Sequence, residues 1–411
     1  MTLPFDTQRL APPLIISGFS SQPYATRIAA HLGSTMVRIA RKQFRDKEIQ
    51  TTIEHNVRGR NVVVIASGSG DPNKQEKEAR LLMRAVQRAA ARRVTLVLPY
   101  MWYGRSDDNW DERNSPALVD TIETLRAHCH DVIVADPHNP GLTREKFIDM
   151  GSPVRSAVMA HFAFPFAVQL KHMIKTGTIA KDRLILAHAD AGSTKRISRS
   201  FRACLYSELL FENRNPDQDD WSQGLKDRDK ATGRITIKGF SSDVAGKDVV
   251  IFEDMIESGG TACELARFLK KVGVRSVTFM VTSGLFTSNA SKGESVTASI
   301  DKINGSDIDA IFITDTFDHR LTDPQVAAAI EASPIIHEID TTPYMALIIR
   351  ALSLDVVDET DLSLNSVSAI LRGVHPKQVH ADQAIARPTH LKPGAFWKCL
   401  RAASSAPEPS A

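Results

Sequence analysis

The stretch Val249-Val250-Ile251-Phe252-Glu253-Asp254-Met255-Ile256-Glu257-Ser258-Gly259-Gly260-Thr261 joins an apolar run to a glycine turn. Residues 249–252 are β-branched or aromatic, which predicts a buried parallel strand that ends before two acids. A helical pattern follows at residues 262–271. A strand, a glycine turn and a helix start form a cup of N–H groups that suits a phosphate, and the acids suit sugar hydroxyls or a cation. An ordinary strand–loop–helix connection would explain the glycines alone; the acids and flanking hydroxyls favour a ribose-phosphate site.

Strands and helices alternate on both sides of this stretch. Residues 212–233 form a polar, charge-rich segment that we expect to be a loop. Helices are expected at 24–32, from Asp71 onward, and at 117–127, 166–174, 193–204 and 343–352. Strands are expected at 14–16, 62–66, 94–98, 132–135, 184–187, 235–237, 277–281, 310–314 and 335–339.

This order is typical of an α/β protein with two similar domains, each a mainly parallel sheet flanked by helices. We expect an N-terminal domain at residues 13–160 and a C-terminal domain at residues 161–353. The pattern weakens beyond them, so residues 354–411 are expected to form a C-terminal extension. Its end is rich in Ala, Ser and Pro, a composition typical of disorder.

The composition of the 411-residue chain is that of a soluble globular protein, with 42% hydrophobic and 24% charged residues. The net charge of +3 is too small to indicate a nucleic-acid partner. No apolar run approaches the roughly 20 residues of a membrane helix, and the first residues do not resemble a signal peptide. The four cysteines are scattered, so reduced thiols and a cytoplasmic location are expected.

Polar residues also follow other predicted strands, where parallel sheets place their binding sites. The aromatic segment after strand 94–98 leads to Arg105 and Asp107, which could serve a nucleotide or simply be surface charges of a packed loop. His138 could meet a metal or a phosphate, or be structural. Asp190 precedes a small-residue turn and could face a phosphate or sugar, or cap a helix.

The charged segment Lys226-Asp227-Arg228 has two interpretations. Cations in a mobile loop can close over a polyphosphate and stabilise the charge that develops during phosphoryl transfer. An exposed charge run can also be merely solvated. No phosphate-binding P-loop and no dinucleotide-binding glycine motif occurs in the sequence, which argues against both of those classes.

Together these segments resemble the ribose-phosphate diphosphokinases, or phosphoribosyl diphosphate (PRPP) synthetases, over roughly residues 14–352. Lys226-Asp227-Arg228 resembles the K-x-R of the family's catalytic loop, because it precedes residues 242–247 at a separation similar to that in the family. This match implies an insertion near residues 212–225, before Lys226. The remaining matches are residues 44–48 to F-x-D-G-E, 53–59 to I-x-x-N-V-R-G, 99–107 to P-Y-x-x-Y-A-R-Q-D, 136–138 to D-L-H, 190–192 to D-x-G-G, and 253–261 to D-D-x-x-D-T-x-G-T.

The resemblance implies two domains of phosphoribosyltransferase type and a homo-oligomer. It also implies an Mg²⁺-dependent reaction, in which the β,γ-diphosphoryl group of ATP is transferred to the anomeric hydroxyl of ribose 5-phosphate. The products would be PRPP and AMP. The catalytic residues it implies are Lys226, Arg228 and His138, with His138 and Asp190 at the metal. The ATP-binding residues it implies are Phe44, Asp46, Glu48, Arg105, Ser106 and Asp107. The ribose-phosphate-binding residues it implies are Asp190, Glu253, Asp254, Glu257, Ser258, Gly259, Gly260 and Thr261.

Several positions depart from the family pattern. They are Lys47, Ser106, Ser193, Glu253, Glu257, Ser258 and Ser283. A glutamate in place of an aspartate moves the carboxylate by about 1 Å, enough to change fit or rate. Two alternatives follow: the same transfer to another 5-substituted ribose such as ADP-ribose, or a non-catalytic regulatory paralogue. The retained His138, Asp190, Lys226 and Arg228 argue against the paralogue. A phosphoribosyltransferase would have no use for the elements around Phe44 and Arg105.

Overall fold

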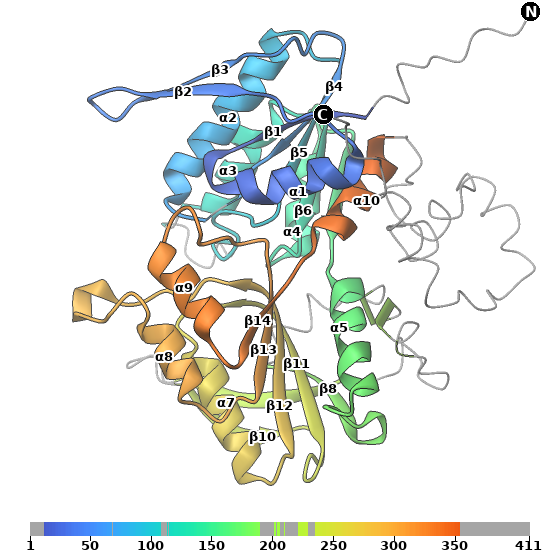
Figure 1. The fold of residues 1–411 in the computed structure, drawn as a ribbon, viewed down its shortest axis with the longest axis vertical. Helices are drawn as coiled ribbons and strands as arrows, with labels where there is room; N and C mark the ends of the chain where they lie inside the picture. Colours follow the sequence, from blue (N-terminus) through green and yellow to red (C-terminus); the bar gives the residue numbers. More distant parts are fainter. Residues whose placement is uncertain are drawn as a thin grey trace, which may run out of the picture.

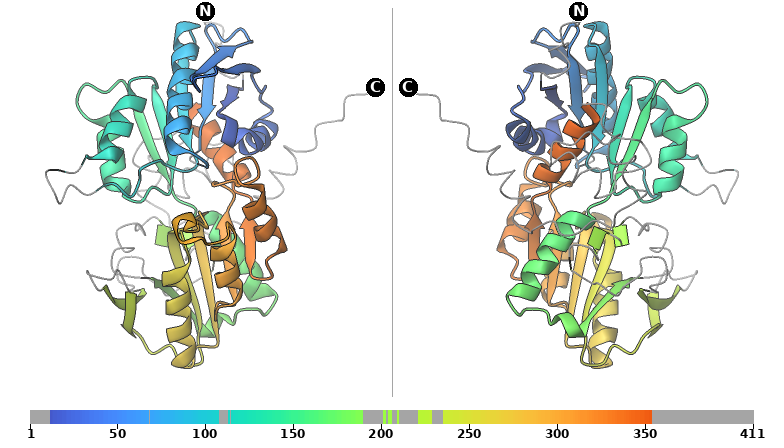
Figure 2. Two further views of the ribbon diagram at one scale, coloured as in Figure 1. Left: turned by 90° about the vertical axis from the view of Figure 1, so that its left-hand side faces the viewer. Right: turned by 90° about the vertical axis from the view of Figure 1, so that its right-hand side faces the viewer.

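The computed structural model describes residues 12–67, 69–107, 113, 115–189, 201–202, 204–205, 209, 221–228 and 235–353 (Figure 1). In these ranges two mainly parallel sheets, each flanked by helices, follow one another along the long axis of the molecule (Figures 1 and 2). The predicted α/β class is confirmed. The division between residues 160 and 161 stays a prediction, and the predicted extension lies outside the described residues.

The first sheet has five parallel strands in the order β1-β4-β5-β6-β7. Strands β1 and β6 are buried throughout and are apolar except for Ser17 and Asp131, as expected of parallel strands covered by helices on both faces. The strands are β1 (Leu14–Ser17), β4 (Asn61–Ile65), β5 (Arg93–Leu98), β6 (Asp131–Ala135) and β7 (Ser156–Ala160).

Helices around the first sheet begin and end at residues suited to those positions. Helix α2 begins after Asp71, whose carboxylate accepts hydrogen bonds from the N–H groups of Asn73 and Lys74. Helix α1 ends at Gly33, which has a left-handed conformation. The sequence analysis missed α4 and β7. The helices are α1 (Gln22–Leu32), α2 (Pro72–Arg88), α3 (Ala117–Arg126) and α4 (Pro140–Ile148), and a 3₁₀ turn, η2 (Phe19–Ser21), precedes α1.

A two-stranded antiparallel hairpin, β2 (Ile39–Gln43) and β3 (Ile49–Ile53), extends outward from the first sheet (Figure 1). The middle of β2 is held by Arg41, whose guanidinium lies 2.7 Å from the carboxylate of Glu78 on α2. Glu78 is buried and also accepts a hydrogen bond from the N–H of Phe19. The hairpin is therefore tied to α2 through β2, while its tip faces away from the rest of the chain (Figure 1).

The second sheet has seven strands in the order β10-β9-β8-β11-β12-β13-β14, all parallel except the β9–β10 pair. The strands are β8 (Leu184–His188), β9 (Ser222–Arg228), β10 (Ile235–Phe240), β11 (Asp248–Ile256), β12 (Ser276–Gly284), β13 (Ala310–Thr314) and β14 (Ile336–Ile339). The helices are α5 (Ala163–Lys175), α7 (Gly260–Lys271), α8 (Ala298–Asn304), α9 (Pro324–Ala332) and α10 (Thr342–Ser353), with 3₁₀ turns η3 (Lys181–Arg183) and η5 (Ala290–Lys292).

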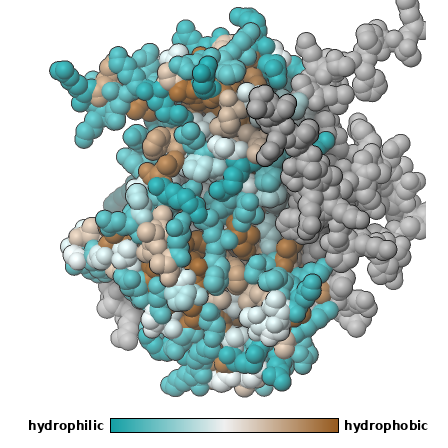
Figure 3. Space-filling view, in the orientation of Figure 1, coloured by the Kyte–Doolittle hydropathy of each residue, from teal (hydrophilic) through white to brown (hydrophobic). Residues whose placement is uncertain are grey.

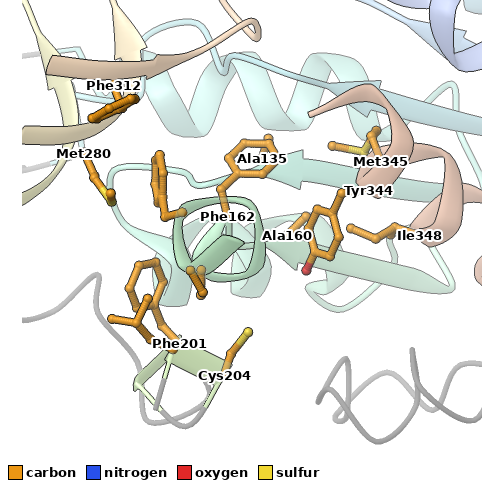
Figure 4. Packing of buried hydrophobic residues seen from close by; sticks show 14 of the residues in the cluster. Ala135, Ala160, Phe162, Phe201, Cys204, Met280, Phe312, Tyr344, Met345 and Ile348 are labelled. Atoms are coloured by element: carbon orange, nitrogen blue, oxygen red, sulfur yellow. The ribbon is translucent and has the colours of Figure 1, made fainter. Parts of the chain in front are cut away.

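A hydrophobic cluster connects the two sheets through α5 and α10. Helix α10 follows the last strand of the second sheet but packs on α1, beside the first sheet (Figures 1 and 2). In Figure 4 the ring of Tyr344 lies close to Phe162, and the two ring centroids are 6.2 Å apart. The same buried cluster includes Ile15 of β1 and Phe312 of β13. Burial of this shared apolar surface holds the two halves together.

Two predictions about the second sheet were wrong. Residues 212–233 were expected to form a loop, but Ser222–Arg228 is strand β9, paired with both β8 and β10. Its polar sequence has no apolar alternation, so the pairing comes from its neighbours. Strand β11 was expected to end at Phe252, but it continues to Ile256 because β12 pairs with it as far as Gly284. The sequence analysis also missed α8 and α9, and the predicted helix 193–204 lies mostly outside the described residues.

Hydrophilic side chains cover most of the face shown in Figure 3, and hydrophobic ones form separate patches. The most exposed large hydrophobic residue among those described is Met150, which lies in the turn after α4. Every helix in the described ranges is too short or too polar for a membrane span. Three of the cysteines, Cys129, Cys204 and Cys263, are buried.

Candidate active site

The carboxyl ends of the strands of both sheets meet between the two halves of the molecule. The hydroxyl of Thr282, near the end of β12, donates a hydrogen bond to the carboxylate of Asp136, just after β6, at 2.6 Å. The hydroxyl of Ser67, after β4, donates to the carbonyl of Thr316, after β13, at 2.9 Å. Because binding sites of parallel sheets lie at these ends, the two sheets share one candidate site.

His138 and Asp254 form the closest contact across this site. The Nδ1 of His138 lies 2.5 Å from the Oδ2 of Asp254. The Asp254 side chain is 7% exposed, while that of His138 is 32% exposed. An ionised carboxylate only accepts hydrogen bonds, so this contact fixes the imidazole with a proton on Nδ1. In the neutral ring Nε2 then carries the lone pair.

A second contact joins the two halves at the surface of the site. The Nη1 of Arg105, in the loop after β5, lies 2.7 Å from the Oε2 of Glu257, and both side chains are half exposed. A pair this exposed contributes at most about 1 kcal/mol to stability, so either group can exchange its partner for a ligand.

The hydroxyl of Tyr100 lies near this pair, and burial raises its pKa. The Arg105 guanidinium opposes that rise in pKa, while the Asp254 and Glu257 carboxylates add to it.

The turn in which the sequence predicts a phosphate cup lies where β11 ends and α7 begins. Glu253 is half buried and Asp254 is buried, because their side chains alternate between the two faces of β11. Gly259 precedes α7 with a φ of 72°, and no side chain caps the helix. The N–H groups of the first turn, from Gly260 and Thr261 onward, have no acceptor within the helix and can bind an anion. Ser258, the loop's serine, is exposed.

A glycine is required at residue 259 for steric reasons as well. A Cβ atom there would lie 2.7 Å from the Cγ1 of Ile303 on α8, closer than real contacts allow. Its left-handed φ is also one that other residues rarely adopt. The turn at residues 258–261 is therefore in direct contact with α8, a helix that was not predicted from the sequence.

The loops after β5 and β6 are joined on the predicted nucleotide side. The Nδ2 of Asn139 donates to the Oδ2 of Asp107 at 2.9 Å, and the Oδ1 of Asn139 accepts from the N–H of Leu142 at the start of α4. The N–H of Ser106 donates to the carbonyl of Tyr103. These contacts bring Arg105, Ser106 and Asp107 beside the segment that carries His138. Sequence reasoning missed Asn139, which follows that histidine directly.

Phe44, Asp46 and Glu48 lie in the turn between β2 and β3, at the tip of a hairpin that extends outward from the first sheet, whose strand β6 precedes His138 (Figure 1). The carboxylate of Asp46 accepts from the N–H of Glu48, and the Nζ of Lys42 lies 4.6 Å from the centroid of the Phe44 ring. Lys47 has a φ of 70°, the left-handed conformation that a glycine adopts without strain. The glycine of the family pattern would adopt this conformation with less strain than Lys47 does.

Other predicted residues are only partly described. Asp190 lies outside the described residues. The backbone of Lys226 and Arg228 is described, in β9, where they pair with Ile237 and Ile235 of β10.

Lys302 on α8 was not singled out from the sequence. Its Nζ lies 3.2 Å from the carbonyl oxygen of Ser258. No local signal could have identified it, because it lies 44 residues away in the chain.

In the part of the chain that the structure describes, no group of three or more His, Cys, Asp or Glu side chains could hold a metal ion. Mg²⁺ is commonly held by one or two carboxylates together with phosphate oxygens and water. His138 and Asp254 can supply a small protein share of such a shell.

Comparisons with known proteins cover most of the chain. A family model described as the N-terminal domain of ribose phosphate pyrophosphokinase matches residues 14–126, and a phosphoribosyl transferase domain model matches residues 214–315. The ribose-phosphate pyrophosphokinase of Hyphomonas neptunium is 28% identical over 331 residues, which cover 79% of this chain and 94% of that protein. The corresponding protein of Aquifex aeolicus is 26% identical, over 74% of this chain and 86% of that protein.

The solved structures add a likeness in fold. The phosphoribosylpyrophosphate synthetase of Mycobacterium smegmatis superposes with a TM-score of 0.64 at 17% sequence identity. That alignment covers 83% of this chain and 98% of that one. The two chains therefore share their overall fold over most of their length.

Proposed function

Because the chain belongs to the ribose-phosphate pyrophosphokinase family of enzymes, we propose that it transfers the β,γ-diphosphoryl group of ATP to the anomeric hydroxyl of ribose 5-phosphate, forming PRPP and AMP. The observation that carries this proposal is the 2.5 Å contact between His138 and Asp254. It places the loop expected to serve the nucleotide next to the strand expected to serve the ribose.

On the acceptor side, the N–H groups of Gly259, Gly260 and Thr261 would bind the 5-phosphate at the start of α7. Asp254 and Glu253 would accept hydrogen bonds from the ribose hydroxyls and thereby orient the anomeric oxygen. Ser258 and Glu257 would line the same loop. Asp190 is proposed to lie on this side as well.

On the nucleotide side, Arg105, Ser106 and Asp107 would hold the sugar and phosphates of ATP. Mg²⁺, when bound near His138 and Asp190, would neutralise phosphate charge and let the acceptor oxygen approach. Lys226 and Arg228 would place two cations over the transferring group. Positive charge aimed at the developing phosphoryl charge is the main catalytic device for this chemistry.

Phe44, Asp46 and Glu48 would complete the nucleotide site of a neighbouring subunit in a homo-oligomer. The hairpin that carries them is tied to α2 by Arg41 and Glu78, and it extends outward from the first sheet, whose strand β6 precedes His138 (Figure 1). A rigid arm of this kind can reach another copy without rearranging its own half of the molecule.

A second acceptor, a larger 5-substituted ribose such as ADP-ribose, is favoured by one observation. Glu257 is longer than the aspartate of the family pattern, and its carboxylate reaches Arg105 across the site. The test is to incubate the pure protein with ATP, Mg²⁺ and either acceptor, and to identify the products by mass spectrometry. Product from ribose 5-phosphate alone supports the main proposal, and product from ADP-ribose alone refutes it. Turnover by the pure protein also excludes the regulatory-paralogue alternative.

A further inference from the structure

Helix α8 supports the loop at residues 258–261 directly. A Cβ atom on Gly259 would lie 2.7 Å and 2.8 Å from two side-chain carbons of Ile303, and 4.0 Å from the carbonyl of Ser299. Ser299 is itself buried, and its hydroxyl donates to the carbonyl of Phe286 at 2.8 Å. The helix is thus anchored to the end of β12 while one face touches the loop.

This contact brings a positive charge to the loop. The Nζ of Lys302 donates a hydrogen bond to the carbonyl oxygen of Ser258 at 3.2 Å. Within the part of the chain that the structure describes, no carboxylate forms an ion pair with Lys302. The adjacent acid, Asp301, instead accepts from the hydroxyl of Thr297 at 2.9 Å. Lys302 therefore keeps its charge available beside the phosphate cup.

The loop's own acid does not cancel this charge. The carboxylate of Glu257 is engaged by Arg105, at 2.7 Å. The partial positive charge of the α7 N-terminus and the full charge of Lys302 both lie beside Ser258. Both attract an anion, and both attract a dianion more strongly than a monoanion.

We propose that Lys302 is a specificity-determining residue that binds the terminal phosphate of the acceptor through its charge. This inference rests on the proposed function, because it assigns the acceptor phosphate to the cup at residues 258–261. A phosphomonoester near neutral pH carries up to two charges on one phosphorus. Each phosphorus of a diphosphate diester such as ADP-ribose carries one. Lys302 therefore favours ribose 5-phosphate over the larger acceptor.

The test compares Lys302→Gln, Lys302→Met and Lys302→Arg with the unchanged protein. Glutamine can still donate a hydrogen bond to Ser258 but has no charge, so it separates binding by charge from simple support of the loop. Lys292→Met is the matched control, because Lys292 is an exposed lysine in the same connection between β12 and α8. Binding of ribose 5-phosphate is measured by calorimetry, and KM for each substrate by initial rates with ATP and Mg²⁺.

We expect Lys302→Gln and Lys302→Met to raise the Kd and KM for ribose 5-phosphate about tenfold, equivalent to about 1.4 kcal/mol. KM for ATP should stay within about twofold, and Lys302→Arg and Lys292→Met should resemble the unchanged protein. Binding to the unchanged protein should weaken with added salt more steeply than binding to Lys302→Gln.

Unchanged acceptor binding in Lys302→Gln overturns the inference, as does an equal rise in both KM values. The binding measurement separates this failure from failure of the proposed function. If ribose 5-phosphate binds and depends on Lys302 but no PRPP forms, the proposed reaction fails and the Lys302 site stands. If ribose 5-phosphate does not bind to the unchanged protein at all, both proposals are wrong.

Discussion

The Nδ1 of His138 lies 2.5 Å from the Oδ2 of Asp254, although 116 residues separate the two in the chain. His138 follows β6 of the first sheet, and Asp254 is part of β11 in the second. The carboxylate therefore sets the tautomer and orientation of a histidine from the other half of the molecule. This contact is where the two proposed substrates would meet.

Replacing Asp254 with Asn should leave the fold intact but remove the charge that orients His138. We expect kcat for PRPP formation to fall by roughly 100-fold or more. The reason is that an asparagine amide holds the same tautomer of His138 less strongly and accepts a hydrogen bond from a sugar hydroxyl less strongly than a carboxylate does. Asp254→Asn, His138→Gln and the double variant are compared by initial rates. If the residues act together, the double variant is about as slow as the slower single one; fully additive losses would contradict this coupling.

Replacing Lys226 with Ala should abolish most diphosphoryl transfer. Loss of one cation or donor aimed at a developing charge typically costs about 10²–10³ in kcat. AMP formation from ATP, Mg²⁺ and ribose 5-phosphate measures the effect. Lys226→Arg is the control that keeps the charge, and Arg228→Ala tests the second cation. If Lys226→Ala forms AMP within a few-fold of the unchanged rate, the assignment of β9 to catalysis is wrong.

The hairpin tip gives a prediction about shared sites. A double variant, Phe44→Ala with Asp46→Ala, should be inactive alone, and so should His138→Gln. Mixing the two should restore part of the activity, because a mixed oligomer contains some sites with an intact tip from one chain and an intact His138 from the other. The mass of the protein in solution must also exceed that of one chain. Absence of any restored activity in a mixed oligomer would assign the tip to its own chain.

Asp315 should make stability depend on pH in the opposite direction to an acid whose pKa is lowered in the folded state by an ion pair. Burial raises its pKa from 3.8 to about 7, even though Thr341 and Arg27 donate hydrogen bonds to it. The folded state then binds a proton more tightly than the unfolded state, so this contribution to stability is full below about pH 4 and is lost as the pH rises to about 7.

The check on Asp315 is urea unfolding of the unchanged protein and of Asp315→Asn across that pH range. The difference between the two curves should change with pH, because the amide cannot titrate. Asp182→Asn, at an exposed acid in η3, serves as the control and should leave the pH dependence as it is. A constant difference for Asp315→Asn would show that this carboxyl does not titrate in the range.

Glu257→Gln should separate acceptor binding from stability. The side chains of Arg105 and Glu257 are both half exposed, so loss of this ion pair should change the free energy of unfolding by less than about 1 kcal/mol. If the Glu257 carboxylate orients the acceptor, kcat/KM for ribose 5-phosphate falls about tenfold or more. Chemical unfolding and initial rates measure the two effects. A large stability loss with unchanged kinetics would make the pair structural.

The sequence predicted elements whose geometry is local. The apolar run at residues 249–252 predicted a buried parallel strand, and the glycines at 259 and 260 predicted the turn into α7. It did not predict β9, because the polar residues 222–228 become a strand only by pairing with β8 and β10. It also missed α8, a short helix whose position depends on packing against the turn at residues 258–261.

By itself, the sequence determined the two-sheet architecture and the residue types at the ends of the strands, since hydrophobic runs and glycine turns act over a few residues. Only the tertiary structure decided that Asp254 meets His138, that Glu257 reaches Arg105 and that Lys302 lies on the carbonyl of Ser258. These distances depend on how segments far apart in the chain pack through the shared hydrophobic cluster. That packing is a property of the whole fold, and no short stretch of sequence contains it.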